Sequence, residues 1–141
     1  RFHEAAECGA PSVSCWGTGT PLREFLHVDD LGEACVFALE RWNPATADAP
    51  RDASGQPLAF LNVGTGVDLT IRELAESVAE ATGYRGRLEW DSSKPDGTPK
   101  KQLDVSRLAE LGWRARIPLA EGLRSTVALF REQLAQEQVR L

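Results

Sequence analysis

The sequence predicts a mixed α/β fold built from small sheets and several helices. Residues 12–15 alternate polar and apolar side chains, which is typical of a strand with one buried face. Residues 58–63 are apolar on both faces, which fits an interior strand that is covered on both sides. Further on, apolar residues recur at helical spacing behind capping residues. Strands and helices are therefore expected to alternate along the chain.

The first elements surround a glycine-rich corner. We expect residues 1–7 to end a helix and a strand to lead into Trp16. Gly17 and Gly19 allow the backbone to turn or to approach a ligand closely. Residues 23–28 are expected to form a second short strand, followed by a helix that begins at Asp29 and Asp30. The apolar face of that helix carries Leu31, Ala34, Cys35, Ala38 and Trp42.

The remaining elements follow a long loop at residues 43–57. Thr70 and Glu73 have capping-box spacing, and the helix behind them is expected to stop at Gly83. Residues 87–90 are expected to form a short strand and residues 91–100 a loop. We expect a short helix capped by Asp104 and stopped by Gly112, then a last helix opened by Pro118 and a frayed tail from Gln136.

Composition bounds the class of protein. The chain has 141 residues, 42% of them hydrophobic and 26% charged, which suits one soluble domain. Its 16 basic and 21 acidic residues give 16 − 21 = −5, which argues against a nucleic-acid partner. No apolar run is long enough for a membrane span, so no membrane association is expected. Cys8, Cys15 and Cys35 lack zinc-site spacing, and we interpret them as reduced thiols of a cytoplasmic protein.

The first residue is Arg1, and the sequence contains no methionine. An intact translation product starts with methionine, so we expect a fragment whose native beginning lies upstream. Neither His3 nor His27 has a metal partner, and no metal site is expected.

Three sequence blocks carry a family resemblance. They are R-E-F-L-H-V-D-D at residues 23–30, N-V-G-T-G-V-D-L-T-I-R-E-L-A at 62–75 and S-K-P-D-G-T-P-K-K at 93–101. Together, from Arg1 to about Phe130, they resemble the C-terminal part of the GDP-L-fucose synthase family, within the extended short-chain dehydrogenase/reductase superfamily. The resemblance implies a C-terminal substrate-binding domain, with the Rossmann phosphate-binding half absent from residues 1–141. Residues 30–42 and 58–63 are expected to belong to the edge of that absent dinucleotide-binding domain.

The resemblance also implies substrate-binding residues. The positions that contact the GDP-sugar in the family match Arg1, Trp16, Arg23 and Asp96 here. Their chemistry suits these roles, because arginine binds diphosphates in a bidentate way and an aspartate accepts hydrogen bonds from ribose hydroxyls. Simpler roles stay open: core packing for Trp16, an ion pair with Glu24, Asp29 or Asp30 for Arg23, and a turn before Gly97 for Asp96. Lys94, Lys100 and Lys101 either add positive potential near the phosphates or form a solvated face.

The residues of the redox chemistry are missing from this sequence. Neither G-T-G turn has the spacing of a dinucleotide phosphate loop, and the single tyrosine, Tyr84, has Leu88 where the family's acid/base pair has lysine. We therefore expect no catalytic residue and no bound NADP(H) in residues 1–141. The resemblance implies NADPH-dependent epimerisation and reduction of GDP-4-keto-6-deoxy-mannose to GDP-L-fucose by the full-length enzyme, a homodimer. The alternatives are a related nucleotide-sugar epimerase, dehydratase or reductase, and a non-catalytic binding module.

Overall fold

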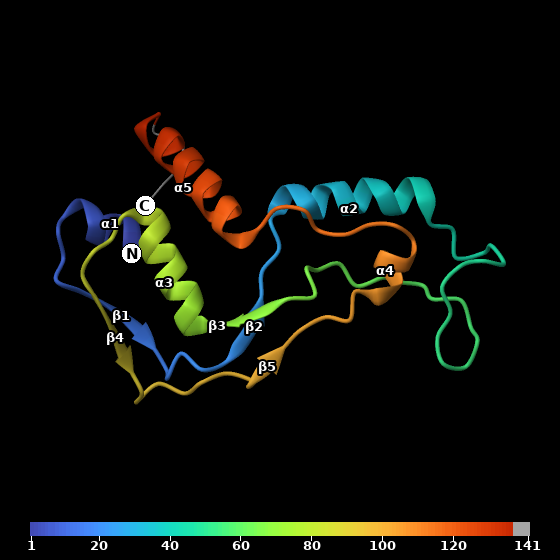
Figure 1. Cartoon of the computed structure of the whole chain (residues 1–141), viewed down its shortest axis with the longest axis horizontal. Helices are drawn as coiled ribbons and strands as arrows, with labels where there is room; N and C mark the ends of the chain where they lie inside the picture. Colours follow the sequence, from blue (N-terminus) through green and yellow to red (C-terminus); the bar gives the residue numbers. More distant parts are fainter. Residues whose placement is uncertain (137–141) are drawn as a thin grey trace. The chain divides into compact units, whose positions relative to one another are not determined.

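The computed structural model describes residues 1–136, and the chain divides into two compact units (Figure 1). Unit 1 comprises Arg1–Arg23, Leu69–Lys101 and Pro118–Leu141, and unit 2 comprises Glu24–Asp68 and Gln102–Ile117. The elements in chain order are α1 (Phe2–Glu7), β1 (Ser12–Trp16), β2 (Leu22–Glu24), α2 (Val28–Arg41), β3 (Asp68–Thr70), α3 (Ile71–Thr82), β4 (Arg87–Asp91), β5 (Lys100–Lys101), α4 (Ser106–Glu110) and α5 (Leu119–Ala135). The predicted mixed α/β fold with small sheets and several helices is confirmed.

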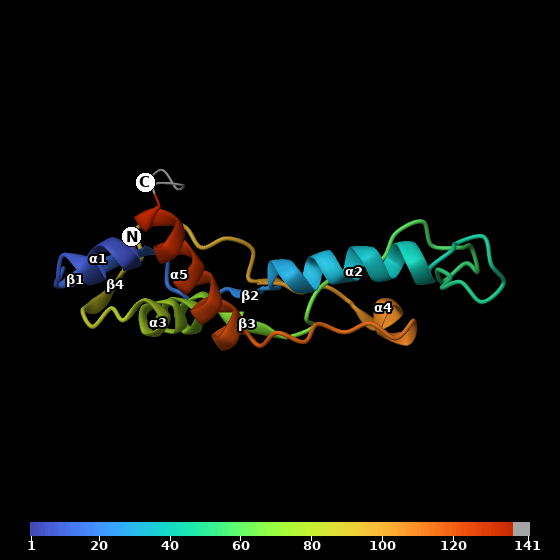
Figure 2. The ribbon, with the colours of Figure 1, turned by 90° about the horizontal axis from the view of Figure 1, so that it is seen from above.

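Unit 1 contains a two-stranded parallel sheet flanked by helices. In register, Ser12 of β1 pairs with Arg87 of β4, and Trp16 pairs with Asp91 at the other end. Side chains of Ala5, Val13 and Tyr84 form the buried cluster between α1 and this sheet. The helix α5 packs against α3, which both views show (Figures 1 and 2). A second sheet has three short strands in the order β3-β2-β5, with β2 and β5 parallel.

The helix α3 begins and ends where the sequence predicts. The Thr70 hydroxyl accepts the backbone N–H of Glu73, and the Glu73 carboxylate accepts the N–H of Thr70, so the capping box is complete. Gly83 ends the helix with φ of 74°, a left-handed conformation that glycine adopts without strain. At this end, the Arg131 guanidinium of α5 donates to the carbonyl oxygen of Thr82 at 2.9 Å. Local capping signals therefore fix both ends of α3.

The start of α2 differs from the prediction. The helix begins at Val28, and its cap is His27, whose Nδ1 accepts the N–H of Asp29 at 3.2 Å. Asp30 lies inside the helix, is almost fully buried, and accepts the backbone N–H groups of Arg116 at 3.1 Å and Ile117 at 2.9 Å. The buried side chains of Ala34, Leu108 and Trp113 form the core of unit 2. Asp30 thus holds a remote segment in place, and its predicted role as a helix cap is wrong.

Residues 58–63 form no strand, which corrects the prediction of an interior strand. Leu61 and Val63 pack against the core of unit 2, whereas the side chain of Phe60 is 69% exposed. The Asn62 amide donates to the carbonyl oxygen of Asp104 at 3.1 Å. In the described part of unit 2 no neighbouring strand supplies ladder hydrogen bonds to this segment, so it does not become part of a sheet.

The last two helices begin close to the predicted positions. Asp104 accepts the N–H of Ser106 at 2.9 Å, just before α4. Pro118 is the residue that precedes the first turn of α5. The frayed tail that we predicted from Gln136 falls, beyond Gln136 itself, outside the described residues.

Candidate functional site

A tight corner between β1 and β2 organises the candidate site, which lies wholly in unit 1. Gly17 and Gly19 both have φ of 79° and are buried. A Cβ atom added at Gly17 would lie 2.2 Å from Oδ1 of Asp96, and one at Gly19 would lie 2.7 Å from the Trp90 ring. Positive φ and close neighbours therefore both require glycine at these two positions.

Asp96 is fixed to this corner by one residue. Its Oδ1 accepts the backbone N–H of Thr18 at 2.9 Å, and its Oδ2 accepts the Thr18 hydroxyl at 2.6 Å. The bond from the Thr18 hydroxyl, and to a smaller extent the bond from the Thr18 N–H, hold the pKa of Asp96 below its ordinary value, because both favour the charged carboxylate. Asp96 is therefore more than a residue of the turn before Gly97: it links the loop after β4 to the corner after β1.

Trp16 is not a core residue in this structure. Its side chain is 65% exposed at the end of β1, and the Lys94 ammonium lies 5.8 Å from the centroid of its ring. An ammonium at this distance over an indole face is attracted by the ring's quadrupole. The exposed indole and the lysine place an aromatic face and a positive charge side by side.

Arg23 on β2 is half-buried, and its Nη1 donates to the carbonyl oxygen of Leu22 at 2.6 Å. A Cβ atom at Gly97 would lie 3.0 Å from Arg23 Nη2, so the loop after β4 passes close to the guanidinium. Within the described residues of unit 1, Arg23 forms no ion pair with a carboxylate. The guanidinium thus retains donors that a ligand can use.

The acidic residues that the sequence offered as partners for Arg23 bind other groups within unit 2. Glu24 accepts the backbone N–H groups of Thr65, of Gly66 at 2.8 Å and of Leu103 at 3.0 Å. Asp30 accepts N–H groups of the segment before α5, as described above. These contacts do not favour the interpretation of Arg23 as a structural ion-pair partner.

Arg1, the remaining sequence-predicted residue, lies beside β1. Its Nη1 donates to the carbonyl oxygen of Ser14 at 3.3 Å, and its backbone amine lies 3.2 Å from Glu4 Oε2. Arg1 and Glu4 are both exposed. All four predicted positions, Arg1, Trp16, Arg23 and Asp96, therefore fall in the same unit.

One loop, residues 92–97, contains Asp96 and approaches Trp16 and Arg23. Through Lys94 it reaches Trp16, through Asp96 it holds the corner, and at Gly97 it approaches Arg23. The arrangement offers an aromatic face, a guanidinium and a hydrogen-bonded carboxylate along one short stretch of surface. Such groups suit a ligand that carries a ring, a diphosphate and hydroxyl groups.

Sequence reasoning missed Arg72, which supports the glycine corner. Arg72, in the first turn of α3, donates its backbone N–H to Gly19 O at 2.9 Å and its Nη2 to Thr18 O at 2.8 Å. Its guanidinium lies over the Trp90 ring, 4.5 Å from the centroid. The only signal in the sequence was that Arg72 lies just after the capping threonine, Thr70. That position does not by itself predict a contact with the glycine corner.

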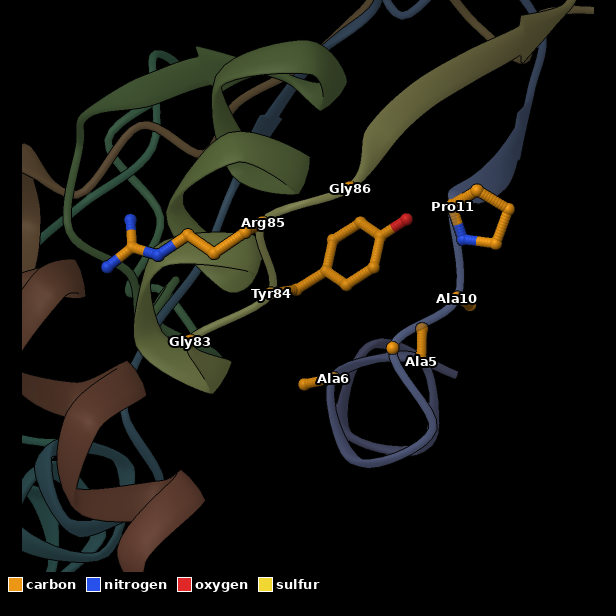
Figure 3. Close-up of a pocket in the computed structure, with 9 residues that line it drawn as sticks. Ala5, Ala6, Ala10, Pro11, Gly83, Tyr84, Arg85 and Gly86 are labelled. Atoms are coloured by element: carbon orange, nitrogen blue, oxygen red, sulfur yellow. The ribbon is translucent and has the colours of Figure 1, made fainter.

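A cavity of about 330 Å³ also lies in unit 1, but away from these residues. It is lined by Ala5, Ala6, Gly9, Ala10, Pro11, Gly83, Tyr84, Arg85 and Gly86. Figure 3 shows the Tyr84 ring reaching towards Pro11, while the Arg85 side chain points away from the cavity. Apart from the Tyr84 hydroxyl, its side chains offer little to orient a polar ligand.

The described residues also limit other kinds of site. In residues 1–136 no cluster of His, Cys, Asp and Glu has an arrangement that could hold a metal ion. None of the helices within that range has the length and apolar character needed to cross a bilayer.

Comparison with known proteins first indicates the class of protein to which this fold is similar. Residues 1–50 match the NAD dependent epimerase/dehydratase family. The fold is the one found in part of a GDP-mannoheptose C4 reductase from Campylobacter jejuni, solved with NADP bound, with a TM-score of 0.74 and 28% identity. That likeness covers 92% of this chain and 42% of the reductase. The α/β fold is thus that of a portion of an extended short-chain dehydrogenase/reductase.

The sequence narrows the resemblance. The chain is 52% identical to GDP-L-fucose synthase from Escherichia coli (strain K12) over 133 residues, which cover 94% of this chain and 40% of that protein. It is 53% identical to GDP-L-fucose synthase 1 from Arabidopsis thaliana over 126 residues, 89% of this chain and 35% of that protein. The resemblance to GDP-L-fucose synthases is confirmed, and the chain spans 40% or less of the length of these two relatives.

Proposed function

We propose that this chain is the GDP-sugar-binding, C-terminal part of an NADPH-dependent enzyme that converts GDP-4-keto-6-deoxy-mannose to GDP-L-fucose. The observation that carries the proposal is the placement of Trp16, Arg23 and Asp96 around one loop of unit 1, in a chain about half identical to GDP-L-fucose synthases. The overall reaction is epimerisation beside a ketone, followed by hydride transfer to the ketone. Residues 1–141 bind and position the sugar nucleotide.

Each residue has a distinct part in binding. The Arg23 guanidinium, with donors left over from its bond to Leu22, binds the diphosphate, and Arg1 adds a second positive charge. Trp16 offers its exposed indole as a wall of the pocket, with Lys94 above it. Asp96 accepts hydrogen bonds from ribose hydroxyls. All of these contacts hold the substrate, and none moves a proton.

We infer that residues 1–141 do not bind NADP(H). At the first glycine corner the Asp96 carboxylate already accepts the Thr18 N–H, and a second negative group there would be repelled. At the second, the N–H groups of Thr65 and Gly66 donate to Glu24. The backbone N–H groups of Thr18, Thr65 and Gly66 are thus already used within the chain, which argues against a pyrophosphate at either turn. We therefore place NADP(H), and the residues that exchange protons, in the remainder of the protein.

We also propose that residues 30–42 and 58–63 pack against that remainder. The outward face of α2 is apolar: Val28 is 70% exposed, Val36 54% and Leu39 87%. Phe60 is 69% exposed. A helix that is apolar on both its inner and outer faces is normally buried on both. The resemblance further supports a cytoplasmic homodimer, and the free thiols of Cys8, Cys15 and Cys35 are compatible with the reducing cytosol.

The test is turnover by the whole protein. Purified enzyme should consume NADPH with GDP-4-keto-6-deoxy-mannose and yield GDP-L-fucose, and the 141-residue chain alone should leave NADPH unchanged. NADPH absorbance and chromatography of the product measure the two outcomes. Turnover confined to a different sugar nucleotide would support a related epimerase or reductase instead. An absence of turnover by the whole protein with any such sugar would support a binding module.

A further inference from the structure

Thr18 occupies the centre of the hydrogen-bond network at the glycine corner. Its N–H and its hydroxyl each donate to a different oxygen of Asp96, at 2.9 and 2.6 Å. The Thr18 oxygen Oγ1 also lies 2.8 Å from the Thr20 hydroxyl and accepts the Thr20 N–H at 3.2 Å. Thr18 has one hydroxyl proton, and the ionised carboxylate can only accept. The Thr20 hydroxyl is therefore the donor to Thr18, and the direction of the chain of bonds is fixed.

The backbone of Thr18 is held from the opposite side. Arg72 Nη2 donates to the carbonyl oxygen of Thr18 at 2.8 Å, while the same guanidinium lies over Trp90. Gly17 before Thr18 and Gly19 after it leave no room for a side chain. Thr18 thus has a single position, and the orientation of the Asp96 carboxylate follows from it.

This orientation leaves Asp96 with capacity for a ligand. A carboxylate oxygen has about two lone-pair directions, and Thr18 uses one on each oxygen of Asp96. One direction remains on each oxygen. A ribose presents two adjacent hydroxyl groups, and these can donate to the two oxygens in parallel. A carboxylate that turned freely would lose this match, because its two oxygens would no longer face both hydroxyls.

We propose that Thr18 is a positioning residue of the sugar-nucleotide site, and that it sets Asp96 to recognise the ribose through both hydroxyl groups. The proposal rests on the proposed function, since it needs a nucleotide at this site. Thr18 itself does not touch the ligand. Its hydroxyl contributes to affinity only while Asp96 is present, and it contributes to the preference for ribose over deoxyribose.

The variants are chosen to separate the effect of the Thr18 hydroxyl on ligand binding from any effect on folding. Thr18→Val keeps the shape and the N–H but loses the hydroxyl, whereas Thr18→Ser keeps the hydroxyl. In the whole protein, Thr18→Val should weaken GDP binding roughly 3- to 10-fold, as expected for one lost hydrogen bond, and Thr18→Ser should stay within about 2-fold of wild type. Thr126→Val, which changes an exposed threonine on α5, serves as the control and should change nothing.

Two calorimetric comparisons test the coupling. The first measures GDP against 2′-deoxy-GDP: the wild type should prefer GDP, and Thr18→Val should lose most of that preference. The second compares Thr18→Val, Asp96→Ala and the double variant. The double variant should bind GDP no more weakly than Asp96→Ala alone, because Thr18 acts through Asp96. A merely structural Thr18 would lower the melting temperature without changing the preference for ribose.

The outcomes distinguish this inference from the proposed function. If the wild type binds GDP and the two substitutions weaken binding additively, or if Thr18→Val keeps the full preference for GDP, the positioning role is wrong and the GDP-sugar site stands. If the wild type binds neither GDP nor GDP-mannose, the proposed function is wrong, and the role of Thr18 in ligand binding is wrong with it.

Discussion

The Arg72 guanidinium lies over the Trp90 indole, with its central carbon 4.5 Å from the ring centroid. Arg72 comes from the first turn of α3 and Trp90 from β4, so the contact joins the helix to the sheet beneath the glycine corner. The ring also lies against Gly19, where an added Cβ would come within 2.7 Å. The pair is therefore part of the structure that keeps the corner in place.

Replacing Arg72 should destabilise the protein. Arg72→Ala removes the cation–π contact and the hydrogen bond to Thr18, and should lower the free energy of unfolding by about 1–2 kcal/mol. Arg72→Lys should lower it less, because the ammonium keeps the charge over the ring but lacks the planar fork. Urea denaturation measures both. Arg85→Ala, at an exposed arginine just after α3, should cost less than about 0.5 kcal/mol, and equal losses at the two arginines would contradict the assignment.

Replacing Arg23 should weaken ligand binding more than it weakens the fold. Arg23→Ala in the whole protein should cost about 2–3 kcal/mol of GDP-sugar affinity, because a charge-assisted hydrogen bond is lost. Arg23→Lys should restore part of it. Calorimetry gives the affinity and a thermal melt gives the stability. Arg116→Ala, which breaks the ion pair with Glu33, is the matched control and should affect only the melt. A lower melting temperature with unchanged affinity for Arg23→Ala would identify Arg23 as a structural residue.

Glu24 should make stability depend on pH. Burial alone would raise its pKa, but bonds from the backbone of Leu103, Gly66 and Thr65 hold the pKa below its ordinary value of 4.5. The folded-state pKa is then lower than the unfolded-state pKa. Glu24 therefore stabilises the fold above about pH 4.5, and this contribution is lost as the pH falls through the folded-state pKa.

A charge-neutral variant isolates this effect. Glu24→Gln should lower the free energy of unfolding by about 1–3 kcal/mol at neutral pH, and its difference from wild type should shrink as the pH falls below 4.5 and through the lowered pKa of Glu24. Denaturant titrations at a series of pH values measure this difference. Glu76→Gln, at an exposed position on α3, should show no such change. A difference between Glu24→Gln and wild type that is constant from neutral to acid pH would show that the charge of Glu24 does not matter.

The apolar outer face of α2 should make the isolated chain associate. Val36 and Leu39 are 54% and 87% exposed, and apolar patches of this kind are usually covered. The 141-residue chain should therefore form dimers or larger species, and Val36→Lys with Leu39→Lys should reduce them. Analytical ultracentrifugation gives the size distribution. Leu129→Lys, which changes a leucine on α5 that is 53% exposed, should have no effect, and a monomeric parent chain would contradict the expectation.

The features that the sequence predicted correctly are mostly local. The capping box of Thr70 and Glu73 and the stop at Gly83 depend on neighbouring residues, so their spacing is sufficient. Asp30 shows the limit of such reasoning. Next to Asp29 it has the composition of a helix start, but its partners lie 86 and 87 residues along the chain. Sequence rules that consider only neighbouring residues cannot identify such a distant partner.

The candidate site likewise contains residues that the sequence indicated and residues that it did not. Trp16, Arg23 and Asp96 were predicted from the family resemblance as substrate-binding residues. The structure brings them together at the loop of residues 92–97, and their role in substrate binding stays a prediction. Thr18 was not predicted, because its value comes from a carboxylate 78 residues further on. The prediction of a strand at residues 58–63 was wrong for a related reason. Apolar residues on both faces indicate burial, but a strand also needs a hydrogen-bonded neighbour, and composition does not reveal whether one is present.

The interleaving of the two units has a consequence for the order of synthesis. Unit 1 combines three stretches of the chain and unit 2 combines two, and the second stretch of unit 2 ends at Ile117. A ribosome therefore releases the glycine corner and α3 well before α5, the helix that packs against α3. Until then the nascent chain carries a helix whose partner has not yet been made, and such intermediates are prone to aggregate. Unit 2 is complete only when residue 117 has been made, and unit 1 only when α5 has been made.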